Sequence, residues 1–152
     1  MNRRLVHFGL AVLLTAGSVA SVPSLAQAAA SDIILTRQAG YDLLGATFGG
    51  MKAAIEAKMD VKPLAGSADA MAKWGKTIPL AFPPGSDTGY PNKALPTIWS
   101  DRAGFEKASV NFTEASEKLS VVAKTGDADA FAAQFKIVGA TCGACHKEYR
   151  AK

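Results

Sequence analysis

The chain has 152 residues, enough for one compact domain, and its formal net charge at neutral pH is +4. This excess is too small to indicate a nucleic-acid-binding protein, because the lysines are dispersed among acidic residues as on an ordinary solvated surface. Basic and aromatic residues also do not alternate as they do in single-strand-binding grooves. The sequence therefore predicts no nucleic-acid partner.

Residues 1–28 have the pattern of a cleaved signal peptide. Arg3 and Arg4 precede the apolar run LVHFGLAVLL, and the small residues on either side of Gln27 fit the A-x-A cleavage rule. A membrane anchor is the alternative for residues 5–22, but glycines and serines dilute that run. We expect cleavage near Ala28 or Ala30 and export of a mature domain of residues 29–152. Loss of the two arginines lowers its net charge to about +2.

Apolar residues in the mature chain recur at helical spacing, which predicts helices rather than strands. The first helix is expected between residues 31 and 59, with a cap at Ser31 or Asp32. A second helix is expected between Pro63 and Pro79. Residues 79–97 hold five of the seven prolines and are predicted to form a loop. The inward stripe of the first helix contains Ile34, Tyr41, Leu44, Phe48, Met51 and Ile55, and that of the second contains Leu64, Ala68, Met71, Gly75 and Ile78.

Two further helices complete the domain. The third is expected to begin at Ser100 or Asp101 and to end at Gly126, and Asp127 is expected to cap the fourth. Four amphipathic helices with one long and two short connections predict an all-α fold, an antiparallel four-helix bundle. The stripe of the third helix contains Phe105, Ala108, Phe112, Ala115, Leu119 and Val122, and that of the fourth contains Phe131, Phe135, Val138, Cys142, Cys145 and Tyr149.

The fourth helix carries the sequence C-x-x-C-H. Cys142 and Cys145 are the only cysteines of the chain, and His146 is the only histidine outside the predicted signal peptide. Their spacing of three and four residues puts them on one face of the helix. A redox pair is disfavoured, because such pairs use a helix N-terminus to lower a thiolate pKa, and this pair lies near a helix C-terminus. A structural zinc would need a fourth ligand, and a disulfide across one helical turn would be strained.

Covalent attachment of haem accounts for all three side chains. Two thiols on one face can add to the two vinyl groups of the macrocycle, and the adjacent imidazole can then bind the iron from the same side. The sequence therefore predicts one haem c, held by Cys142 and Cys145, with His146 as axial metal ligand.

The other axial position of the iron is open to two interpretations. A methionine there would give a low-spin electron carrier, and Met51, Met59 and Met71 are available in the mature chain. Met51 and Met71 lie on predicted core faces, where filling the core is the simpler interpretation. Without a sixth ligand, ferrous iron would bind small neutral gases.

Four segments of the sequence resemble the class II c-type cytochromes, in particular the high-spin cytochromes c′. The resemblance covers almost the whole mature chain. It implies a periplasmic haem protein that transfers one electron to or from an unidentified redox partner. It also implies binding of small gases such as NO or CO, and a homodimer formed through the first two helices. The segments are TRQAGYDLLGATFGGMKA, PLAFPPGSD, PTIWSD and VGATCGACHKEYRAK.

The resemblance also implies roles for individual residues. Tyr41 stands where low-spin members have a methionine, and because a neutral phenol is a poor ligand it is expected to cover five-coordinate iron as a lid. Arg37 and Gln38 are expected near the haem propionates, and an anionic partner would also explain an arginine on an inward stripe. Phe82 is expected in the pocket wall and Arg150 near the proximal imidazole. No acid–base group is apparent beside the iron, so we do not expect an enzyme.

Overall fold

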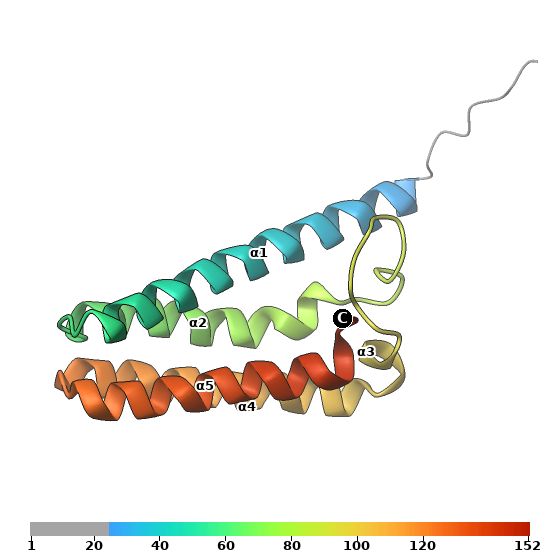
Figure 1. Cartoon of the computed structure of the whole chain (residues 1–152). Coiled ribbons are helices and arrows are strands. Elements are labelled where there is room, and N and C mark those ends of the chain that lie inside the picture. Colours follow the sequence, from blue (N-terminus) through green and yellow to red (C-terminus); the bar gives the residue numbers. More distant parts are fainter. Residues whose placement is uncertain (1–24) are drawn as a thin grey trace, which may run out of the picture.

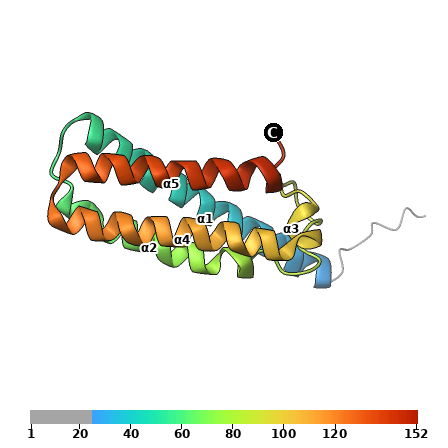
Figure 2. The ribbon, with the colours of Figure 1, turned by 90° about the horizontal axis from the view of Figure 1, so that it is seen from below.

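A computed structural model describes residues 25–152 (Figure 1). Successive long helices run in opposite directions, which confirms the predicted antiparallel four-helix bundle (Figures 1 and 2). No β-strand forms in this part of the chain, where Ala94 and Arg150 form an isolated antiparallel bridge. The long helices are α1 (Leu25–Glu56), α2 (Ala65–Thr77), α4 (Arg102–Thr125) and α5 (Ala128–Tyr149), and the short ones are η1 (Lys62–Leu64), η2 (Ile78–Ala81) and α3 (Thr97–Ser100).

Helix α1 begins earlier than expected. It starts at Leu25, so the predicted cap at Ser31 or Asp32 is wrong, and the hydroxyl of Ser31 instead donates to the Gly89 carbonyl at 2.8 Å. The alanines that precede Ser31 have the highest helix propensity of any residue and extend the helix backwards. Most of the predicted signal peptide lies outside the described residues. None of the helices within residues 25–152 is long and apolar enough to cross a membrane.

Local signals set the other helix ends. Helix α1 ends after Glu56 because Lys58 adopts a left-handed conformation with a φ of 52°, which closes the helix with backbone bonds to the preceding turn. The predicted caps around the tight turn between α4 and α5 are confirmed. Gly126 is left-handed with a φ of 80°, and the carboxylate of Asp127 accepts from the Ala130 N–H at 2.9 Å. Asp101 likewise accepts from the Gly104 N–H and starts α4.

The predicted apolar stripes meet in the core. The largest side chains that are almost fully buried include Phe105, Phe131, Ile34, Met51 and Met71. Helices α2 and α4 are joined by hydroxyl residues that the predicted stripes did not include. The hydroxyl of Ser109 donates to the Gly75 carbonyl at 2.6 Å, and that of Ser120 donates to the Ala65 carbonyl at 3.1 Å. Helix α1 diverges from this tight pair toward its Leu25 end (Figure 1).

Candidate haem site

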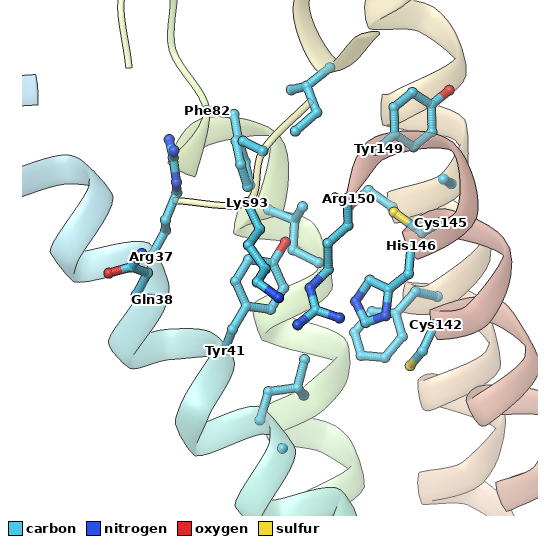
Figure 3. Close-up of a pocket in the computed structure, with 18 of the residues that line it drawn as sticks. Arg37, Gln38, Tyr41, Phe82, Lys93, Cys142, Cys145, His146, Tyr149 and Arg150 are labelled. Atoms are coloured by element: carbon cyan, nitrogen blue, oxygen red, sulfur yellow. The ribbon is translucent and has the colours of Figure 1, made fainter. Parts of the chain in front are cut away.

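A cavity of about 900 Å³ lies between α1 and α5 (Figure 3). Helices α2 and α4 contribute to its floor, and the loop between η2 and α3 contributes to its rim. Cofactor-sized pockets in proteins typically have volumes of roughly 300–1,000 Å³. The cavity is therefore large enough for a macrocycle.

All three side chains of the C-x-x-C-H sequence line this cavity. Figure 3 shows Cys142, Cys145 and His146 on the α5 side. Both thiols are half-buried and free, and burial raises the pKa of each. Burial, and then the charge of Arg150, lower the pKa of His146, which favours the neutral imidazole that binds metals. These three side chains do not form a metal-binding cluster by themselves, since no group of three or more His, Cys, Asp or Glu side chains placed to hold a metal ion occurs in residues 25–152.

Tyr41 occupies the opposite wall, on α1 (Figure 3). Its ring packs edge-on against Trp74 with a centroid separation of 5.7 Å and lies 6.3 Å from the ring of Phe82. Burial raises the pKa of Tyr41 well above its ordinary value, so the phenol stays neutral. Tyr41 thus presents an uncharged aromatic ring to the cavity from α1.

Phe82 is buried in the cavity wall, and its ring packs against those of Phe105 and Trp99. The guanidinium of Arg37 lies over the Phe82 ring, 4.4 Å from its centroid. Phe82, Phe105 and Tyr41 give the loop end of the cavity an apolar surface, and the cationic Arg37 borders it.

Arg37 has neutral partners among the described residues. It is only 2% exposed, and its guanidinium donates to the Ser86 hydroxyl at 3.0 Å and to the Asn92 side-chain carbonyl at 3.2 Å. A longer contact of 3.4 Å reaches the Ala81 carbonyl. The loop between η2 and α3 therefore supplies the acceptors that allow this arginine to be buried.

Gln38 and Arg150 lie at the rim of the cavity. The amide of Gln38 donates to the Pro91 carbonyl at 2.9 Å, so it too holds the loop. Arg150 follows the last turn of α5 and lies near His146, as its effect on the imidazole pKa indicates. The structure thus brings all eight predicted site residues to one cavity.

Sequence reasoning missed two charged residues of the cavity lining, Asp42 and Lys93, and discounted another candidate. Lys93 lies on the loop and lines the cavity, but no periodicity or motif marks it in the sequence. Met71 is 2% exposed and also lines the cavity, whereas Met51 does not and Met59 is 59% exposed. Among the three methionines, Met71 is therefore the candidate for a sixth ligand.

Comparison with known proteins identifies the family. The family description Cytochrome C′ matches residues 32–150. The chain belongs to the cytochrome c′ family. It is 34% identical over 123 residues to cytochrome c′ from Rubrivivax gelatinosus, and this match spans 80% of this chain and 95% of that protein. The crystal structure of cytochrome c′ from Thermochromatium tepidum matches with a TM-score of 0.75 and 30% identity, over 81% of this chain and 97% of that one.

Two structures of an Alcaligenes xylosoxidans cytochrome c′ contain bound gases. One is a nitric oxide complex and the other a carbon monoxide complex of variant proteins. Each matches with a TM-score of 0.71 and 32% identity and covers 80% of this chain, and the matches span 94% and 95% of those chains respectively.

Haem c is the covalently bound cofactor of the cytochrome c′ family, and the residues of the cavity fit it. The donor set comprises two thiols and one imidazole on a single helical face, which suits vinyl addition and iron ligation. The remaining wall is largely aromatic and aliphatic, as a macrocycle requires, and the rim carries cationic side chains suited to its carboxylates.

Proposed function

We propose that this chain is a periplasmic haem protein that transfers one electron and binds NO or CO at an open axial position of the iron. Cys142 and Cys145 would hold the macrocycle and His146 would bind the iron from the α5 side. The observation that carries the proposal is Tyr41, the α1 side chain across the cavity from His146 (Figure 3). A neutral phenol there leaves the iron without a sixth ligand from α1.

The haem group supplies the redox couple and the gas-binding iron, and the protein controls access to it. Tyr41 and Phe82 form an apolar wall, so hydrated ions would have to lose water to enter, whereas NO and CO would not. Tyr41 acts as the lid over the iron. Arg37 and Gln38 border the edge of the cavity where the haem carboxylates are expected, and Arg150 accompanies the proximal imidazole.

The gas complexes of the Alcaligenes xylosoxidans relative support gas binding by this chain, because the match extends over most of both proteins. The proposal does not include an enzymatic reaction. His146 is the sole histidine of residues 25–152, so no second imidazole is present there for acid–base chemistry. Periplasmic location rests on the signal-peptide pattern of residues 1–28.

A homodimer through α1 and α2 is part of the proposal. The outer face of α1 carries two exposed leucines, Leu35 at 43% and Leu43 at 71% exposure. Exposed Ala39, Ala46 and Gly50 continue the same helical face and would let a second helix approach closely. Sedimentation equilibrium of the wild type and of Leu43→Glu tests this. A wild-type dimer that the charge converts to a monomer is expected, and a monomeric wild type would contradict it.

A low-spin electron carrier is the second candidate, because Met71 lines the same cavity. Titration of the reduced holoprotein with CO, followed by its optical spectrum, separates the two candidates. We expect ready, saturable CO binding that is unchanged in Met71→Leu, since leucine conserves the apolar volume. If the wild type ignores CO and Met71→Leu binds it, Met71 is the sixth ligand and the lid function of Tyr41 is wrong.

A further inference from the structure

The rim of the cavity carries two cationic side chains from different parts of the chain. Lys93 belongs to the loop between η2 and α3, and Arg150 follows the end of α5. Figure 3 shows both side chains directed into the space between α1 and α5. Lys93 had no predicted role, and the resemblance to cytochromes c′ did not include it.

Backbone hydrogen bonds fix the position of Lys93 relative to the helix that carries the cysteines. The Ala151 N–H donates to the Lys93 carbonyl at 2.8 Å, and the Leu95 N–H donates to the Tyr149 carbonyl at 3.1 Å. Between them Ala94 and Arg150 form the isolated antiparallel bridge. The loop is therefore joined to the end of α5, and Lys93 is held at the cavity although its side chain forms no hydrogen bond or ion pair within residues 25–152.

The charges at this rim are unbalanced. Neither Lys93 nor Arg150 takes part in any ion pair found within residues 25–152. The other charged or titratable side chains that line the cavity are Arg37, Tyr41, Asp42, Cys142, Cys145, His146 and Tyr149. Asp42 is the only carboxylate in the described lining, against the cationic side chains of Arg37, Lys93 and Arg150. Like charges directed into one space repel each other, and an anion placed between them would remove that repulsion.

Arg37 is poorly suited to be the main partner of such an anion. Its guanidinium already donates to Ser86, Asn92 and Ala81, as described above. Asn92 in turn accepts from the Ala94 N–H at 3.0 Å and donates to the Asp87 and Tyr90 carbonyls at 3.1 and 3.0 Å. The buried arginine thus anchors the loop at the residue next to Lys93, and its donors are largely used for that purpose.

We propose that Lys93 forms an ion pair with a carboxylate of the haem, opposite Arg150, and that Arg37 is a positioning residue that anchors the loop. This assignment rests on the proposed attachment of haem to Cys142 and Cys145. The ligand group is an alkyl carboxylate, which a flexible ammonium can reach from the rim. Arg37 then contributes its positive charge and holds the loop in place, whereas Lys93 forms the principal bond to the carboxylate.

The test is the pH dependence of the reduction potential of the holoprotein. An opposite charge nearby lowers the pKa of a carboxyl group by about 1–3 units, so Lys93→Gln should move the carboxylate step of the potential–pH curve upward by about one pH unit. The potential should also fall, because loss of a cation favours ferric iron. Lys136→Gln, an exposed lysine of α5 outside the cavity lining, is the matched control and should leave the curve unchanged.

Lys93→Arg should retain the wild-type curve, which also shows that the loop tolerates substitution. If Lys93→Gln and Lys136→Gln give the same curve, the proposal is wrong. It is also wrong if Arg37→Gln shifts the step and Lys93→Gln does not. A wild-type protein that lacks covalent haem would instead contradict the proposed function itself, and that result is visible before any variant is made.

Discussion

Substitution of Gly40 by alanine tests how Tyr41, the proposed lid residue, is supported. A Cβ atom at Gly40 would lie 2.0 Å from Cη2 of Trp74, and 2.5 and 2.6 Å from two further ring atoms. Ordinary contact between carbon atoms needs about 3.5 Å or more, so the indole must move by roughly 1.5 Å. The same indole packs edge-on against Tyr41. The variant should therefore disturb both the stability of the bundle and the lid.

The size of the effect follows from two opposing contributions. Overpacking of this kind lowers the free energy of unfolding by about 1–3 kcal/mol, and replacement of a helical glycine by alanine raises it by up to about 1 kcal/mol. We expect Gly40→Ala to lower the free energy of unfolding by about 1–2 kcal/mol. Gly49→Ala is the matched control on the same helix, because no atom lies within 4 Å of its added Cβ and it lies outside the cavity lining. It should raise the free energy of unfolding by up to about 1 kcal/mol.

Unfolding of both holoproteins by guanidinium chloride, followed by far-UV circular dichroism, measures the difference. CO association with the reduced forms measures the effect on the lid, and only Gly40→Ala should change it. Equal stability of the two alanine variants would mean that Trp74 does not lie against α1. A destabilised Gly40→Ala with an unchanged CO rate would mean that Trp74 does not support Tyr41.

Three further variants examine the lid, the loop and the end of α5. Tyr41→Ala should accelerate CO association roughly fivefold in stopped-flow measurements, since aromatic contacts worth about 1 kcal/mol would no longer hold the lid, and an unchanged rate would count against it. Arg102→Ala removes bonds to the Phe82 and Pro79 carbonyls at 2.9 and 2.7 Å and should lower the free energy of unfolding by about 2–3 kcal/mol in denaturant titrations. The exposed control Lys107→Ala should change it by less than about 0.5 kcal/mol, and similar losses in both would refute a role for Arg102. The hydrogen bond to Asp101, aided by burial, raises the pKa of Tyr149 to about 12. The stabilisation of the fold by this hydrogen bond is therefore complete below pH 10 and is lost as the pH rises toward 12. Tyr149→Phe should be less stable than the wild type at neutral pH and approach it in this alkaline range, whereas parallel stability curves would contradict the assignment.

Much of the fold was predictable because short-range signals determine it. Asp101, Gly126 and Asp127 mark helix ends through their own side-chain and backbone chemistry, and the structure uses each as expected. Periodicity placed Tyr41 and the cysteines on inward faces, because in a helix the spacing in sequence determines the face on which a side chain lies. The early start of α1 was not predicted, because the high helix propensity of the alanines before Ser31 outweighs the cap that Ser31 or Asp32 could form.

Other parts depend on contacts between distant segments and leave no local signal. Ser109 and Ser120 are polar residues, yet they are buried because each finds a backbone carbonyl on α2. Lys93 lies in a proline-rich loop, and only the backbone bonds to the end of α5 bring it to the cavity. The partners of Arg37 likewise come from a loop that has no periodicity to read. Such residues could not be assigned before the path of the loop was known.

We propose that the haem iron keeps one axial position free beneath Tyr41. The electron paramagnetic resonance spectrum of the ferric holoprotein at neutral pH tests it most directly. We expect a high-spin signal, because the neutral phenol of Tyr41 is a poor ligand. A low-spin signal would mean that a protein side chain, Met71 first among them, occupies the sixth position, and the proposal of an open axial position would be wrong.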